Sequence, residues 1–138
     1  MSAKRRRALA LMERLRGLDI DEVSREMADA RSQMEKLTAS RTELREKLET
    51  ERNVTRPEAL PYVSSFVEAV TRQIRRIDAK ITDLEPVLSK FEDQMRELYR
   101  EQKVYESVRL RDLRNEQIAA EKRETAEMEE LTLLRWNR

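Results

Sequence analysis

The 138-residue chain contains no cysteine and no histidine. Without thiolates and imidazoles it lacks common nucleophiles, the proton shuttle of neutral pH and the usual soft or borderline metal ligands. No disulfide can form, so the composition gives no sign of an oxidising compartment. We therefore expect no metal site and no cofactor.

Chain breakers and aromatic residues are also scarce. The chain has one glycine and three prolines, and aromatic residues make up only 4% of it. One glycine cannot build a phosphate-cradling loop, and no serine has a histidine base, so we do not expect an enzyme. Hydrophobic residues account for 38% and charged residues for 41%. This balance predicts long helices that bury narrow apolar stripes rather than a globular core.

Charge of one sign does not dominate, because 29 basic and 28 acidic residues leave a net charge of +1. We expect no nucleic-acid partner, since such binding needs an excess of basic residues on one face. The basic run Lys4–Arg7 indicates either a solvated tail or a contact with phosphate, anionic lipid or an acidic protein. The apolar run that follows it ends at Glu13 and is too short for a signal sequence or a membrane span, so we expect a cytoplasmic chain without direct membrane insertion.

Apolar residues recur in alternating steps of three and four along two stretches of the chain. This spacing is typical of the stripe that faces a partner helix in a left-handed coiled coil. Eight of nine positions are apolar in the first stripe: Ile20, Val23, Met27, Ala30, Met34, Leu37, Arg41, Leu44 and Leu48. All ten are apolar in the second stripe: Val67, Val70, Ile74, Ile77, Ile81, Leu84, Leu88, Phe91, Met95 and Leu98.

Two of the three prolines, Pro57 and Pro61, lie between the stripes, where Thr55 and Glu58 have the spacing of a helix-capping box. Folding the chain back here sets the stripes antiparallel, with Met34 opposite Ile81. The sequence thus predicts an all-α, long antiparallel two-helix coiled-coil hairpin with a longer second helix. We expect a single domain over 1–138, with helix 1 at about 4–53, a turn at 54–61 and helix 2 at about 62–134.

Three features depart from this regular pattern. The apolar set Ala8, Leu11, Leu15 and Leu18 is out of phase with the first stripe, which predicts a break in helix 1 near 17–19, at Gly17. Pro86 lies at an outward-facing position, where it is expected to bend helix 2 without ending it. Residues beyond about 111 have no predicted partner within the chain, and Trp136 near their end is either a buried anchor in a partner or part of a frayed tail.

A candidate binding row follows the turn. Phe66, Val70, Gln73 and Ile77 recur in steps of four, three and four along one side of helix 2. One interpretation is that Phe66 widens the core of the hairpin near its turn. The other is that the row forms a partly exposed apolar patch that binds another protein.

Three stretches carry a family resemblance: Leu11–Glu26, Tyr62–Ile74, and Lys103–Glu106 through Met128–Arg135. In these stretches the chain resembles the FliJ family of the bacterial flagellar type III export apparatus. The resemblance covers nearly the whole chain, although Glu129 and Glu130 stand where the family often has Asp-Glu. It implies a non-enzymatic protein that acts as stalk or activator of the hexameric export ATPase and as a general chaperone or chaperone escort.

The resemblance also implies partners and a location. The expected partners are the export ATPase and its regulator, other export chaperones and the cytoplasmic domain of the export-gate membrane protein. For the gate, the family's contact row corresponds to Phe66, Val70, Gln73 and Ile77, with Gln73 in place of a small apolar residue. The implied location is cytoplasmic, peripherally associated with the inner membrane through the apparatus.

Other interpretations remain open at this point. The same rod is expected of the equivalent stalk in a virulence type III secretion system. A structural coiled-coil adaptor that pairs its stripes between chains is a further alternative. Arg41 argues against a parallel homodimer, because it would face its own copy.

Overall fold

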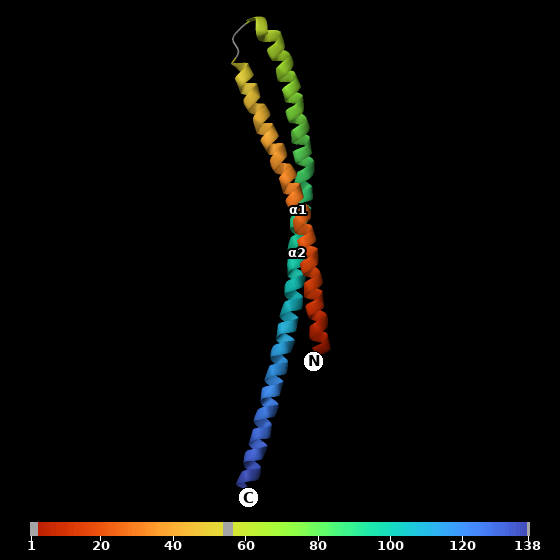
Figure 1. Ribbon diagram of the computed structural model, residues 1–138, viewed down its shortest axis with the longest axis vertical. Helices are drawn as coiled ribbons and strands as arrows, with labels where there is room; N and C mark the ends of the chain where they lie inside the picture. The colour runs from red at the N-terminus through yellow and green to blue at the C-terminus, as the bar shows by residue number, and fades with distance from the viewer. Residues whose placement is uncertain (1–2, 54–56, 138) are drawn as a thin grey trace. The chain divides into compact units, whose positions relative to one another are not determined.

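The computed structural model describes residues 3–53 and 57–137. Helix α1 spans Ala3–Arg52, a short 3-10 turn, η1, spans Pro57–Ala59, and helix α2 spans Leu60–Trp136 (Figure 1). No strand occurs among these residues. The predicted class is confirmed: the protein is an all-α two-helix hairpin whose second helix is the longer. Thr55, half of the predicted capping box, lies outside the described residues.

The contacts between the helices divide the chain into two compact units. Residues 22–95 form one, here called the hairpin unit, which contains the turn. Residues up to Asp21, together with those from Arg96 onward, form the other, here called the terminal unit. Each helix contributes to both units and has no break along its length.

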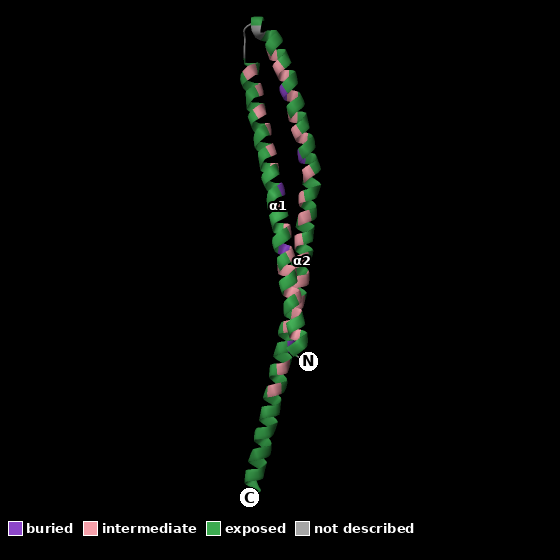
Figure 2. Cartoon of the chain, turned by 45° about the vertical axis from the view of Figure 1, so that its right-hand side comes forward, coloured by how far each residue is buried: buried purple, intermediate pink, exposed green. Residues whose placement is uncertain are grey.

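In the hairpin unit, burial follows the predicted stripes. Between Glu22 and Thr50 the residues of the first stripe are buried or half-buried, and every other residue is exposed. Every residue of the second stripe is likewise buried or half-buried, and Figure 2 shows these classes along both helices. Val70 and Ile81 are among the most buried residues. The alternation of three and four therefore determines which side of each helix faces the other.

The register of the hairpin unit differs slightly from the predicted one. Leu37 and Leu84 line one groove, and Leu44 and Ile77 line another. These pairs show that the chain folds back slightly later than a pairing of Met34 with Ile81 requires.

Helix α1 is uninterrupted at 17–19, so the predicted break near Gly17 is wrong. Gly17 instead lets the side chain of Gln102 on α2 come close to the backbone of α1. A Cβ atom at Gly17 would lie 3.2 Å from Nε2 of Gln102, whose amide donates a hydrogen bond to the carbonyl oxygen of Glu13. Helix α2 also continues through Pro86, which is exposed as predicted. None of the described helices has a stretch long and apolar enough to cross a membrane.

Candidate functional site

The terminal unit keeps the same three-and-four spacing but fills it with polar residues. Stepping back from Ile20 gives Arg16, Glu13, Leu9 and Arg6, and stepping on from Leu98 gives Gln102, Tyr105, Arg109, Asp112 and Glu116. All nine are buried or half-buried, and seven of them are polar. We call these nine residues the polar seam. The helices thus keep one register here while the chemistry between them changes.

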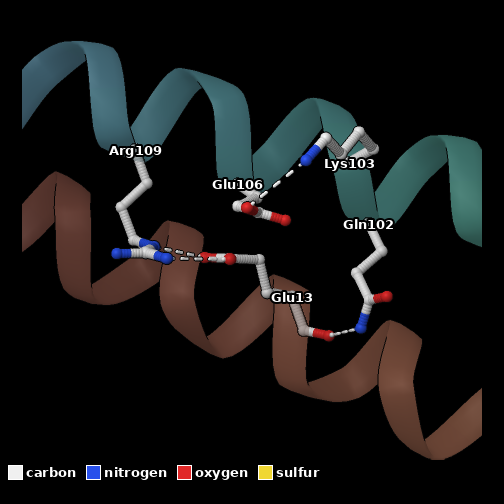
Figure 3. A network of polar contacts seen from close by, with 5 residues as sticks. All are labelled: Glu13, Gln102, Lys103, Glu106 and Arg109. Atoms are coloured by element: carbon white, nitrogen blue, oxygen red, sulfur yellow. Dashed lines mark hydrogen bonds and ion pairs between the residues drawn. The ribbon is translucent and has the colours of Figure 1, made fainter.

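Glu13 is the centre of the polar seam (Figure 3). Its carboxylate accepts two hydrogen bonds from Arg109, at 2.5 Å from Nε and 3.1 Å from Nη2. Its backbone carbonyl accepts the bond from Gln102 at 3.2 Å. A two-pronged contact of this kind fixes orientation as well as distance, so Glu13 and Arg109 set how α1 and α2 align.

Further ion pairs join the helices on both sides of Glu13. Arg16 lies 3.3 Å from Glu101, Arg5 lies 3.2 Å from Asp112, and Arg6 pairs with Glu116. Asp112 is the one buried acidic residue of the described chain, with 7% of its surface exposed. Partly exposed ion pairs stabilise a structure weakly, typically by about 0–1 kcal/mol each. The terminal unit is therefore held by alignment of charges more than by apolar burial.

Arg109 keeps its charge across the whole physiological range. The hydrogen bond to Glu13 raises the pKa of Arg109 above its ordinary value, against a smaller opposing effect of desolvation. Because the pKa of Arg109 is raised, its charge contributes fully to folding stability at pH values below the ordinary pKa of arginine. This contribution is lost only when the pH rises through the raised pKa. Salt concentration, rather than deprotonation of Arg109, is thus the variable that weakens this contact.

The out-of-phase apolar residues of α1 lie on its outer surface. Leu11, Leu15 and Leu18 are 55%, 40% and 58% exposed, and we call them the leucine row. Because the polar seam occupies the inner positions, these leucines have no place between α1 and α2. Lys4, Arg7 and Arg14 are exposed on the same stretch of helix.

Helix α2 continues beyond the last ion pair with α1, at Glu116. We call residues 117–136 the overhang (Figure 1). Every described residue from Glu121 onward is exposed. The exposed set includes five large apolar residues, Met128, Leu131, Leu133, Leu134 and Trp136. A helix that displays so many apolar side chains has the composition of a binding surface.

The row predicted to bind the export gate is divided by the fold. Val70 is buried, with 5% of its surface exposed, and Ile77 is half-buried within the second stripe. Phe66 is half-buried near the turn, and Gln73 is exposed. Phe66 and Gln73 are thus the two members of the row with surface open to a partner, whereas Val70 packs inside the hairpin unit.

A comparison with known protein families identifies the family of this chain. The family model described as flagellar FliJ protein matches residues 7–138. The chain belongs to the FliJ family. No curated protein and no solved structure matches it significantly.

As a FliJ-family member, the chain is a component of the flagellar export apparatus, and the family is non-catalytic. The family description is flagellar, which favours that apparatus over the virulence counterpart left open by the sequence. The match includes the whole overhang and, of the basic run, only Arg7.

Sequence reasoning missed the polar seam of this FliJ-family chain. The search followed apolar residues only, and it therefore took Leu11, Leu15 and Leu18 as evidence of a break. A usable signal was present: Arg6, Glu13 and Arg16 continue the first stripe, and oppositely charged residues continue the second. Complementary charges at stepped positions indicate an uninterrupted helix pair as well as leucines do.

Proposed function

We propose that the chain is the stalk and activator of the hexameric flagellar export ATPase, and that its terminal unit engages the ATPase. The overhang is the observation that carries this proposal. It is a preformed helix with exposed leucines and Trp136, and tryptophan is enriched among residues that dominate binding energy. From Glu121 to Trp136 it extends roughly 24 Å at 1.5 Å per residue.

The direct test is the rate of ATP hydrolysis by the purified hexamer with and without this chain. We expect the intact chain to stimulate hydrolysis and a chain shortened after Ala120 to lose most of the effect. The shortened chain keeps every ion pair described between α1 and α2, so circular dichroism should find it still helical. Absence of stimulation by the intact chain would rule out the activator role.

The proposal extends to the export gate, with contact through Phe66, Val70, Gln73 and Ile77. Phe66 and Gln73 would touch the cytoplasmic domain of the gate protein directly. Val70 and Ile77 would support them from inside the hairpin unit, because a residue that is 5% exposed offers a partner little surface. The contact with the gate protein would therefore depend on intact packing of the second stripe in the hairpin unit.

The two phenylalanines provide a matched test of the gate contact. Both Phe66 and Phe91 are half-buried, and both lie on α2 in the hairpin unit. We expect Phe66→Ala to weaken binding to the gate domain about tenfold or more, as loss of a buried aromatic anchor does. Phe91→Ala should leave binding unchanged. Equal losses for the two variants would show that the effect is one of stability alone.

We further propose the general chaperone or escort role, with the protein located at the cytoplasmic face of the apparatus. Family membership supports this part of the proposal. The test is co-purification of the chain with export chaperones and the ATPase regulator from a flagellated cell. Recovery of the ATPase alone, with no chaperone, would leave the stalk role standing and remove the escort role.

A further inference from the structure

The leucine row and the overhang are two exposed apolar surfaces within one unit. They cannot cover each other in a single chain. Helix α1 runs antiparallel to α2 in the terminal unit, so the overhang leads away from the start of α1. We propose that two copies of the chain pair through their terminal units, with the overhang of each copy lying along the leucine row of the other.

The order of charged and apolar residues favours this partner. Helix α1 begins with the basic run Lys4–Arg7, and its leucine row follows. The overhang has the complementary order: five glutamates against two basic residues between 121 and 130, then Leu131, Leu133 and Leu134. Aligned in the same direction, the two segments bring opposite charges together first and apolar side chains together next. In the reverse direction the leucines would face the glutamates.

A twofold axis supplies that direction. Two α2 helices related by a twofold axis that is perpendicular to them run antiparallel, and each therefore runs parallel to the α1 helix of the other copy. The segments also match in extent, since α1 contributes residues 3–21 to the terminal unit and the overhang comprises 117–136. Each overhang is therefore about as long as the α1 segment that contains the leucine row of the other copy.

Exposed basic residues provide the electrostatic part of the contact. Arg5 and Arg6 pair with Asp112 and Glu116 of their own chain, whereas the side chains of Lys4 and Arg7 are exposed. All five glutamates of the overhang are exposed as well. Opposed patches of this kind steer association and set orientation, and their effect falls as salt rises.

Symmetry makes each of these contacts twice. A stable interface typically buries roughly 800 Å² per partner, which a single contact between short helices does not reach. Two equivalent contacts together approach that buried area, and charged residues form the rim of the interface. We accordingly expect a reversible pair in the micromolar range rather than an obligate dimer.

Sedimentation velocity of the full chain tests the pairing. We expect the average mass to rise from monomer to dimer across the micromolar range at low salt, and the transition to move to higher concentration at high salt. Leu15→Lys should keep the chain monomeric at every concentration reached. Val87→Lys, at a residue that is 41% exposed against 40% for Leu15, should dimerise like the unchanged chain.

A reciprocal charge exchange tests the geometry of the pair. A parallel alignment that sets Lys4 beside Glu121 of the other copy also sets Arg7 beside Glu124. In this alignment Arg7→Glu places glutamate against Glu124 twice in the pair, and Glu124→Arg places arginine against Arg7 twice. Each variant alone should dimerise roughly three- to tenfold more weakly, in line with exposed ion pairs. An equal mixture should recover the affinity of the unchanged chain, because the mixed pair has opposite charges at both contacts.

Three results would overturn the proposal. The first is a full chain that stays monomeric at every concentration and salt level. The second is a dimer that Leu15→Lys leaves intact, since the leucine row would then lie outside the interface. The third is a mixture of the two charge variants that associates no better than either one alone. None of these results bears on stimulation of the ATPase, which is measured separately.

Discussion

The hairpin unit and the terminal unit use one helical register for two kinds of contact. In the hairpin unit the stepped positions contain apolar residues, with Arg41 as the one polar exception, paired to Asp78 at 3.0 Å. In the terminal unit seven of the nine residues of the polar seam are polar. The difference teaches that the three-and-four pattern fixes geometry, while the residues that fill it set the strength of the contact.

The strength of the two contacts follows from their chemistry. Apolar burial contributes about 25 cal/mol for each Å² removed from water, and it depends little on salt. Partly exposed ion pairs contribute little, and salt screens them. We therefore expect the hairpin unit to provide most of the stability and the terminal unit to open more readily. The more readily opened unit is the one that we propose engages the ATPase.

The largest expected effect is loss of apolar packing in the hairpin unit. Ile81 is 8% exposed, and Ile81→Ala should lower the free energy of unfolding by about 2–3 kcal/mol through lost burial and a residual cavity. Urea unfolding followed by circular dichroism measures the change. Val87→Ala, at a 41% exposed position nearby, should stay within about 0.5 kcal/mol. Equal losses for the two would contradict the assigned stripe.

In the terminal unit, a substitution that replaces a charged residue with an apolar one is expected to raise stability rather than lower it. Asp112→Leu replaces a buried carboxylate with an apolar side chain and should raise the free energy of unfolding by roughly 1 kcal/mol. Arg5, which pairs with Asp112, is half-exposed, so its charge stays in contact with water in the variant. Glu116→Leu, whose side chain is 42% exposed, should change stability less. A clear loss with Asp112→Leu would mean that the ion pairs hold the unit more strongly than burial could.

The smallest expected effect concerns the single glycine. Gly17→Ala should raise stability by up to about 1 kcal/mol, because alanine restricts the unfolded chain and favours helix. The new methyl group meets only the flexible end of Gln102, which can shift by a few tenths of an ångström. Thermal melts of the full chain would detect the rise. A fall in melting temperature would show that the bond from Gln102 to Glu13 contributes more than the helix propensity.

The fold of the hairpin unit was predictable because apolar residues alone define it. The stripes from Val23 to Leu48 and from Val67 to Met95 were assigned residue by residue from spacing, and all of these residues are buried or half-buried. The register between the two helices of the hairpin unit was harder to predict from the sequence. A stripe repeats every seven residues, so sliding one helix by a single step leaves apolar residues opposite one another.

The terminal unit was less predictable, for a different reason. Apolarity marks a buried position in most helices, yet here Leu11 and Leu18 are exposed while Asp112 is buried. Only the pairing of charges between distant residues, such as Glu13 with Arg109, identifies the inner face. The gate row shows a related ambiguity, since Val70 and Ile77 belong both to that row and to the second stripe. Spacing alone could not decide which of the two the helix buries.

The continuity of the register through the terminal unit is the central claim, and the absence of cysteine allows a clean measurement of it. Two double variants place cysteines at the same level of the helix pair: Glu13→Cys with Arg109→Cys, and Leu11→Cys with Arg109→Cys. Under mild oxidation of dilute protein, we expect the 13–109 pair to form an intramolecular disulfide rapidly and the 11–109 pair to form little. Faster closure of the 11–109 pair would place the leucine row between the helices and contradict the account.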